Sequence, residues 1–241
     1  MNKFETKIYY FYVIISFVFI TATTDYLSLF DIIHVANQTD TISYSKIARM
    51  APLLTSESDI IIQHVAQRFL IPYVVGSLAH FLDIDFFLVF KIFTFLFIFF
   101  YIFLINSLIN KFNFNLKVSI LFFSILFLNP YIIRYHIFQP VQAHDMLFFS
   151  LGLFFVLTII NKKYYTNLLV TITTAYLRQT SIALLIGSSI FFLINRKIKL
   201  LIVLLILFFF SIVLTIKIGQ HMSLKPFPLN LAYSLIFYDF S

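Results

Sequence analysis

Three short polar stretches hold the residues that could do chemistry in an otherwise apolar chain. They are the charged segment 37–68, the segment 129–145 (NPYIIRYHIFQPVQAHD) and the tripeptide 178–180. A carboxylate can act as a general base on a hydroxyl group. A guanidinium matches the oxygens of a phosphate. Together these residue types indicate acid–base chemistry beside a phosphate group, if the fold brings the three stretches to one place.

Asp145 is the most informative acid. It begins the apolar run MLFFSLGLFFVLTII, and His144 precedes it. One interpretation is an acid that interacts favourably with the N-terminal end of a helix dipole. The other is a carboxylate that binds a metal or positions a reacting sugar, because ionisable groups at membrane depth are costly and tend to be functional.

A second acid is expected from the first polar stretch. Asp40, Tyr44 and Ala48 follow one another at four-residue spacing, which puts them on one face of a short helix. Asp40 is then either the cap of that helix or a working partner of Asp145. Asp25 is the runner-up, since it closely follows the first apolar segment, and the alternative for it is a simple interfacial charge.

Arg178 is the main candidate for binding an anion. A permanent cation so close to a membrane needs an anionic partner or water, and a planar guanidinium suits the phosphate of a lipid carrier. The alternative is a side chain that snorkels to the interface. Further substrate-binding candidates come from the same three stretches: Arg134, His144, Arg68, Gln179 and His64.

Composition predicts an integral membrane protein. Of the 241 residues, 61% are hydrophobic and only 11% are charged, whereas soluble domains carry about a quarter charged residues. The absence of cysteine excludes disulfides and thiol chemistry. We interpret the net charge of +7 as a marker of the cytoplasmic side. It does not indicate nucleic-acid binding.

Basic residues orient the chain. Lys3 and Lys7 precede the first apolar segment, which places the N-terminus in the cytoplasm and the loop 26–85 outside. Segment 69–83 is apolar but shorter than the roughly 20 residues that a span needs. If it lies along the outer surface, nine basic residues fall inside and six outside.

We therefore predict an all-α, polytopic membrane helical bundle of about seven spans. It forms a single membrane domain over residues 1–241, with a long first extracytoplasmic loop that carries surface-lying helices. The predicted spans are 8–24, 86–109, 117–133, 146–161, 164–177, 181–194 and 200–218.

Four stretches resemble the membrane module of the C-type glycosyltransferases (the GT-C fold), which use polyprenyl-phosphate sugars. DTISYSKIA places Asp40 as the acid of the first outer loop, and QAHDMLFFSLGLFFVL places Asp145 as the acid of the second. QRFLIPYVVGSLAHFLDIDFF is similar to an R-x-L-x-P stretch of bacterial members. AYLRQTSIALL is similar to the Arg-Gln-Thr segment of some glucosyltransferases that use lipid-linked sugars.

The chain departs from this family in two places. The acid pair that usually follows the first span is not present, because Asp25 stands with Tyr26. Many members continue well past seven spans, whereas this chain ends at FYDFS. The resemblance therefore predicts a minimal or truncated member.

The resemblance implies hexosyl or pentosyl transfer from a polyprenyl-phosphate donor to a glycan, lipid or protein acceptor of the cell envelope. The reaction would take place at the outer face of the cell membrane, the inner membrane of a bacterium. Asp40 would be the base or would orient the acceptor, Asp145 would orient the acceptor or a metal, and Arg178 would hold the donor phosphate. Some members use Mg²⁺ or Mn²⁺ and others do not, so a metal on Asp40 and Asp145 stays open.

Two other functions remain open. The first is an inactive or truncated relative that acts as a subunit. The second is a transporter of small molecules or lipids, which would need polar groups on both sides of the membrane and usually shows repeat symmetry. The polar groups cluster on one predicted side and no internal repeat is present, which favours the enzyme.

Overall fold

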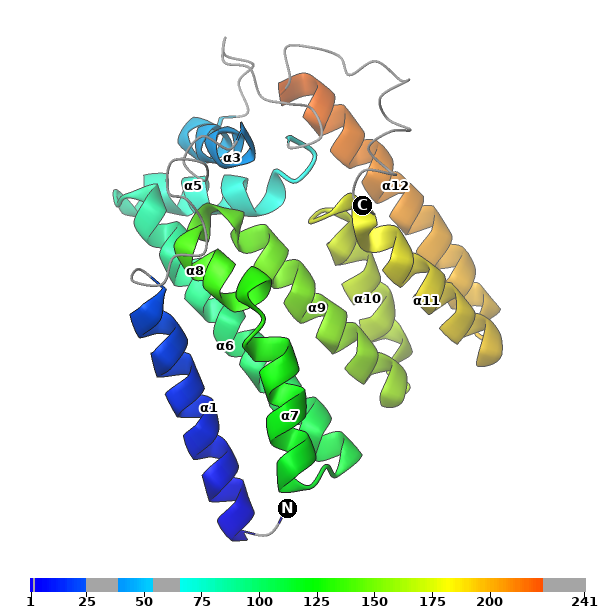
Figure 1. Ribbon diagram of the computed structural model, residues 1–241. Helices are drawn as coiled ribbons and strands as arrows, with labels where there is room; N and C mark the ends of the chain where they lie inside the picture. Colours follow the sequence, from blue (N-terminus) through cyan, green and yellow to red (C-terminus); the bar gives the residue numbers. More distant parts are fainter. Residues whose placement is uncertain (2, 25–38, 54–65, 223–241) are drawn as a thin grey trace.

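The protein is helical wherever the structure describes it. The computed structural model (Figure 1) describes residues 1, 3–24, 39–53 and 66–222, and each regular element in these ranges is a helix. The all-α prediction is therefore confirmed. Four of the described helices are long and apolar enough to cross a membrane: Lys3–Thr23 (α1), Phe86–Phe112 (α6), Pro140–Ile160 (η2 and α9) and Ile198–Met222 (α12).

A fifth candidate span is broken by a proline. α7 (Leu116–Phe127) runs into the π-helix η1 (Pro130–Arg134) and the short α8 (Tyr135–Phe138), with a bend of 41° between the two parts. Asn129 begins the second part, because its side-chain oxygen accepts a hydrogen bond from the Tyr131 N–H at 3.0 Å. Proline lacks an N–H and favours this first helical position, so the chain restarts as a new helix there.

The remaining two predicted spans correspond to shorter helices. α10 (Tyr164–Ala175) and α11 (Ile182–Ile194) have 12 and 13 residues, and η3 (Gln179–Ser181) links them. A helix of 12 residues is about 18 Å long, well short of a hydrocarbon core of about 30 Å. The structure thus has four to five candidate spans by length and composition, and the count of seven stays a prediction.

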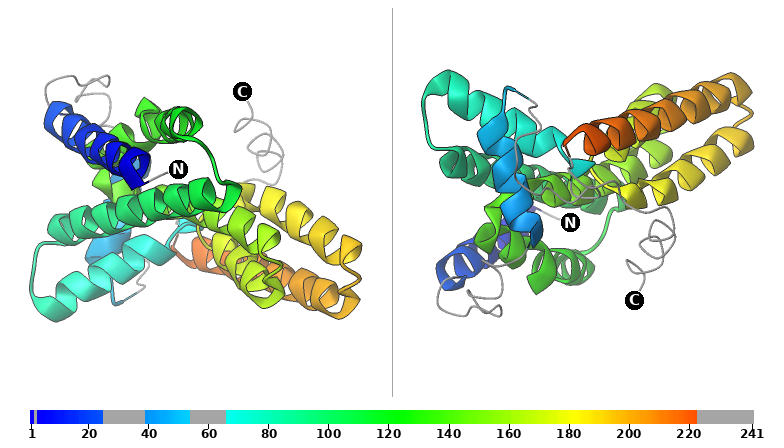
Figure 2. Two further views of the ribbon diagram at one scale, coloured as in Figure 1. Left: turned by 90° about the horizontal axis from the view of Figure 1, so that it is seen from below. Right: turned by 90° about the horizontal axis from the view of Figure 1, so that it is seen from above.

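Two helices lie across one end of the bundle (Figures 1 and 2). They are α3 (Thr39–Met50) and α5 (Leu70–Leu82). A Cβ atom added to Gly76 of α5 would lie 2.0 Å from the carbonyl oxygen of Ala48 in α3, so the two backbones are in direct contact there. We call this the surface-helix end, because α5 covers the segment predicted to lie along a membrane surface.

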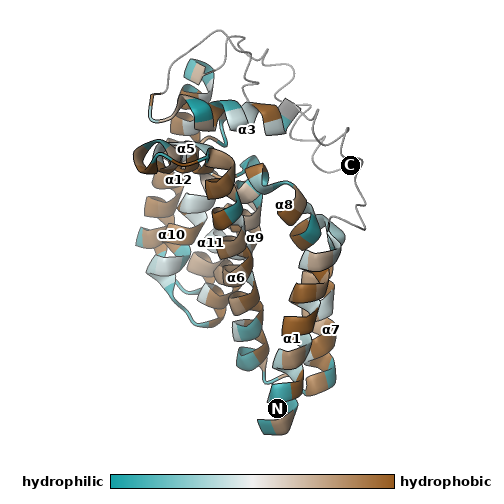
Figure 3. Ribbon diagram, turned by 90° about the vertical axis from the view of Figure 1, so that its left-hand side faces the viewer, coloured by the Kyte–Doolittle hydropathy of each residue, from teal (hydrophilic) through white to brown (hydrophobic). Residues whose placement is uncertain are grey.

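The other end of the bundle collects basic residues. The connections α6–α7, α9–α10 and α11–α12 all lie there, together with the start of α1 (Figure 1). Figure 3 shows mainly apolar residues along the helices and hydrophilic residues at this end. We call it the lysine-rich end, and its connections carry Lys111, Lys117, Lys162, Lys163, Arg196, Lys197 and Lys199.

One apolar core joins the elements that meet at the surface-helix end. Its fully buried members include Tyr44 of α3, Val75 of α5, Phe90 of α6, Ala143 of α9 and Leu177 after α10. Burial of each of the larger side chains stabilises the fold by roughly 1.5–3 kcal/mol. This packing fixes the residues next to Ala143 and Leu177, which are those of the candidate site.

Candidate functional site

Asp145 lies buried in the first turn of α9 (Ala143–Ile160). Only 8% of the residue is exposed. The 3₁₀-helix η2 (Pro140–Gln142) precedes α9 and turns the chain into it. An acid in the first turn interacts favourably with the helix dipole, which is the first of the two interpretations that the sequence allowed for Asp145. Burial at this depth also requires a specific partner, because an isolated buried carboxylate is costly.

Arg178 is that partner. Its Nε lies 3.2 Å from Oδ1 of Asp145, and its guanidinium lies 5.9 Å from the ring centroid of Phe148 on the same helix. Arg178 itself sits in extended backbone between α10 and η3, and 22% of its side chain is exposed. The structure therefore joins the acid predicted in the second outer loop to the cation predicted to bind phosphate.

His144 and Tyr44 pack against this pair. Nε2 of His144 lies 3.4 Å from Oδ1 of Asp145, and the imidazole has no exposed surface. The Tyr44 ring of α3 lies with its centroid 4.4 Å from that of His144. α3 thus covers the first turn of α9. We call Tyr44, His144, Asp145 and Arg178 the arginine–aspartate cluster.

A second arginine borders the cluster. Nε of Arg68 donates to Oε1 of Gln179 at 3.1 Å, and Nε2 of Gln179 donates to Oε1 of Gln67 at 2.9 Å. Burial acts against the Arg68 charge, but Tyr44, Asp145 and Asp40 nearby raise its pKa above the ordinary value. The cation is therefore permanent, and it carries positive charge to the edge of the site.

Asp40 shares electrostatic neighbours with Asp145. It lies half-buried in the first turn of α3, one helical turn from Tyr44. Burial raises the pKa of Tyr44, Arg68 opposes that rise, and both Asp145 and Asp40 add to it. The two predicted acids therefore act on the same tyrosine and on the same arginine, Arg68.

Five buried polar atoms of the cluster have no hydrogen-bond partner among the described residues. The Tyr44 hydroxyl, both nitrogens of His144, Oδ1 of Asp145 and Nε of Arg178 are all buried without a partner in hydrogen-bonding geometry. The charged contacts have short distances but poor angles. Buried polar groups in native proteins nearly always have partners, so such a concentration requires an explanation. Capacity to bind a polar ligand or water is the simplest one.

The remaining predicted residues lie outside the arginine–aspartate cluster or outside the described residues. Arg134 donates from Nη2 to Oγ1 of Thr23 at 2.9 Å, so it links η1 to the end of α1. Gln179 is exposed and accepts a hydrogen bond from Arg68 at the border of the cluster. Asp25 and His64 lie outside the described residues. Their part in the site stays a prediction.

The cluster does not fit a divalent cation. Among residues 3–24, 39–53 and 66–222, no three His, Asp or Glu side chains are grouped so that they could hold a metal ion. Asp145 is in contact with Arg178, and a guanidinium competes with a metal for the same carboxylate.

Two contributors were not predicted as site residues. Tyr44 was identified only as a residue on the helical face of Asp40, and that four-residue spacing was the available signal. Oγ1 of Thr41 donates to Oε1 of Gln139 at 3.3 Å, which ties α3 to the segment before η2. No local sequence pattern predicts that contact, because 98 residues separate its two partners.

Comparison with protein-family models, with curated proteins and with solved structures found no match.

Proposed function

We propose that the chain is a membrane glycosyltransferase that moves a hexose or pentose from a polyprenyl-phosphate donor to an acceptor hydroxyl. One observation carries the proposal: Asp145 and Arg178 form a buried ion pair among unsatisfied polar atoms. The pair lies at the surface-helix end of an apolar bundle, beneath α3. A water-poor site with fixed charges strengthens every electrostatic contact with a reacting phosphate.

The proposed topology has seven crossings, with the N-terminus in the cytoplasm of a bacterium. The lysine-rich end then faces the cytoplasm, as the positive-inside rule expects. The surface-helix end and the arginine–aspartate cluster face outward. α10 and α11 cross as a short, tilted hairpin, and α5 lies along the outer surface.

The proposed reaction has balanced steps. The acceptor oxygen forms a bond to the anomeric carbon of the sugar, and the bond from that carbon to the phosphate oxygen breaks. Asp40 takes the proton from the acceptor hydroxyl. Arg178 and Arg68 stabilise the charge that develops on the departing polyprenyl phosphate.

Asp145 is placed to position Arg178. Nε of Arg178 faces the Asp145 carboxylate, and a guanidinium has five N–H donors in a fixed fork. The carboxylate can therefore hold one edge of the fork while a phosphate binds to the other. Asp145 also orients the acceptor in this scheme, through the carboxylate oxygen that does not face Arg178.

The test is transfer from a radiolabelled polyprenyl-phosphate sugar by the purified protein in proteoliposomes. We expect Asp40→Asn and Arg178→Lys each to lower the rate by about 100-fold, the usual size for a lost base or charge stabiliser. Asp83→Asn is the matched control, because Asp83 is exposed at the C-terminus of α5 and asparagine tolerates its left-handed φ of 53°. Wild-type rates in Asp40→Asn and Arg178→Lys would contradict the proposed roles.

Topology has a separate test. The chain has no cysteine, so a single introduced thiol can be labelled without background. We expect Lys111→Cys to react with an impermeant maleimide only from the cytoplasmic side, and Lys46→Cys only from outside. Labelling of residue 111 from outside would overturn the seven-crossing topology.

A further inference from the structure

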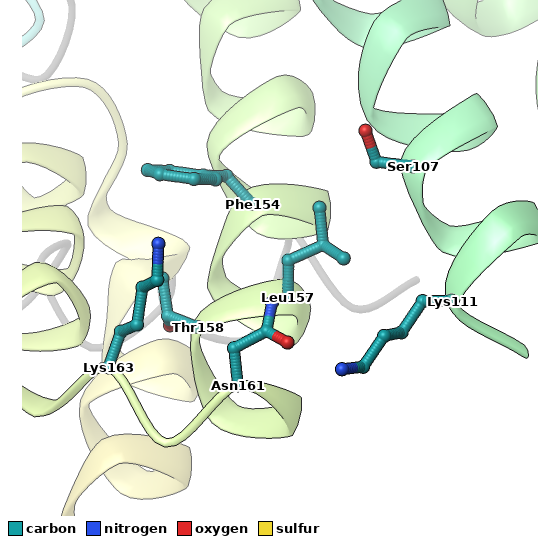
Figure 4. A pocket seen from close by; sticks show the side chains of 7 residues that line it. All are labelled: Ser107, Lys111, Phe154, Leu157, Thr158, Asn161 and Lys163. Carbon is teal, nitrogen blue, oxygen red and sulfur yellow. The ribbon is translucent and has the colours of Figure 1, made fainter.

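A pocket lies between α6 and α9 at the lysine-rich end (Figure 4), at the opposite end of α9 from Asp145. Its cavity volume is about 210 Å³. The lining residues are Ser107, Lys111, Phe154, Leu157, Thr158, Asn161 and Lys163. The pocket thus combines two cations and polar groups with an apolar wall, and the proposed transfer reaction uses none of these residues.

α6 supplies Ser107 and Lys111 of the lining, and α9 supplies Phe154, Leu157 and Thr158. Phe103, Ser107 and Lys111 follow at four-residue spacing on one face of α6. Phe103 is 63% exposed, so an exposed apolar side chain lies one helical turn from Ser107. We call this exposed position the apolar track. In Figure 4 the Lys111 side chain extends from α6 toward Asn161 at the end of α9.

The lysines are not needed to cap α9. The backbone N–H groups of Asn161, Lys162 and Lys163 donate to the carbonyls of residues 157, 159 and 158, at 2.8–3.0 Å. These bonds satisfy the last carbonyls of the helix, which side-chain cations otherwise often approach. The ammonium groups of Lys111 and Lys163 are therefore available to a ligand.

No described acid neutralises these two lysines. Within residues 3–24, 39–53 and 66–222, neither Lys111 nor Lys163 forms an ion pair. Glu5 is the only described acid at the lysine-rich end, since the others lie in α3, around the α5–α6 turn and at the start of α9. The pocket accordingly has an excess of positive charge.

We propose that this pocket binds the phosphate headgroup of an anionic phospholipid from the adjacent leaflet. Lys111 and Lys163 contact the phosphate, and Ser107 and Asn161 hydrogen-bond the headgroup. One acyl chain follows the apolar track at Phe103. Basic pockets between membrane helices are suited to such headgroups, and the apolar wall favours a lipid over a free anion.

Native mass spectrometry of the detergent-solubilised full chain tests the proposal. Phosphatidylglycerol, phosphatidylcholine and inorganic phosphate are added in separate titrations. We expect tight binding of phosphatidylglycerol only. Each lysine near a lipid phosphate contributes about fivefold in affinity, so Lys111→Gln with Lys163→Gln should weaken binding by about 25-fold.

The matched control is Lys117→Gln with Lys199→Gln, which removes the same charge at the same end but outside the pocket. It should change the affinity by less than about twofold, because it leaves the headgroup contacts intact. All variants should keep the thermal midpoint of the wild type, since the four lysines are exposed. An equal loss in both double variants would overturn the pocket in favour of general surface charge. Displacement of the lipid by millimolar phosphate, or equal binding of phosphatidylcholine, would overturn the lipid headgroup as the ligand.

Discussion

Two buried polar clusters that share the helix α9 are built in opposite ways. In the first, Nδ2 of Asn167 donates to Oγ1 of Thr158 at 2.9 Å, and Oγ of Ser188 donates to Oδ1 of Asn167 at 2.8 Å. Thr171 joins Ser188 at 2.6 Å. We call these four residues the asparagine network. In the second, the arginine–aspartate cluster, five buried polar atoms lack a hydrogen-bond partner within the part of the chain that the structure describes.

This difference distinguishes a polar cluster that stabilises the fold from one that is available to a ligand. A fully satisfied network contributes stability and a unique packing arrangement, and here it joins α9, α10 and α11. A cluster with unmet hydrogen-bonding capacity costs stability in the absence of a ligand. We infer that the asparagine network holds the hairpin in place, and that the arginine–aspartate cluster is kept for what it binds.

The largest expected effect comes from neutralising the ion pair. Asp145→Asn alone leaves Arg178 buried without a counter-charge, which costs about 3–5 kcal/mol. Asp145→Asn with Arg178→Gln removes both charges, so the protein should regain most of that stability. Transfer of labelled sugar should still fall by about 100-fold or more, because the phosphate loses its cation. Wild-type transfer by the folded double variant would show that the pair is only structural.

The next effect should appear in stability alone. Asn167→Ala removes the side chain that links Thr158 to Ser188 and leaves both hydroxyls short of a partner. We expect a loss of about 3 kcal/mol in the free energy of unfolding, measured in detergent micelles. The transfer rate per folded molecule should stay within about twofold. A specific loss of transfer in folded Asn167→Ala would end the distinction between the two clusters.

A pair of glycines tests whether α3 must sit closely over the site. An added Cβ at Gly76 meets the Ala48 backbone at 2.0 Å, whereas at Gly152 it meets nothing within 4 Å. Gly76→Ala should therefore displace α3, lower stability by about 2 kcal/mol and lower transfer by about tenfold. Gly152→Ala should be neutral or stabilising by up to about 1 kcal/mol. Thermal melts and initial rates of both variants decide this, and full activity in Gly76→Ala would contradict a role for α3.

The smallest effect concerns one hydroxyl. The Tyr44 hydroxyl interacts with the Arg68 guanidinium but has no partner in good hydrogen-bonding geometry among the described residues, so Tyr44→Phe should change stability by less than about 0.5 kcal/mol. Tyr164→Phe is the control, because that hydroxyl donates to Asn195 at 3.1 Å and its loss should cost about 1 kcal/mol. If Tyr44 contacts substrate, only Tyr44→Phe should lower transfer, by several-fold in initial-rate measurements. The reverse pattern would remove Tyr44 from the site.

Much of the helical layout was predictable from local patterns. The apolar runs predicted α6, α9 and α12, whereas the span predicted over 117–133 was expected to be continuous and is broken at Pro130. Segment 69–83 was expected to be a helix across the outer surface, and α5 lies across the end of the bundle. The segments predicted over 164–177 and 181–194 correspond closely to α10 and α11, and their crossing of a membrane stays a prediction because both helices are short.

The sequence predicted which residues form the candidate site better than it predicted which of them contact each other. Asp145 and Arg178 were selected separately because a charge in an apolar chain needs a partner. That they partner each other follows from the packing of α10 against α9, 33 residues apart along the chain. Asp40 was expected to be a working partner of Asp145, and in the structure both acids act electrostatically on Tyr44 and Arg68.

The sequence by itself determined that this protein is helical, apolar and asymmetric in charge. Composition and the spacing of lysines are properties of the chain, and they act wherever a residue lies in a helix or a turn. Only the tertiary structure decided which charges meet, because contacts such as Tyr44 with His144 join helices that are far apart in sequence. It also decided which buried polar groups are satisfied. A hydrogen bond depends on distances and angles between elements, and these exist only after the helices have packed.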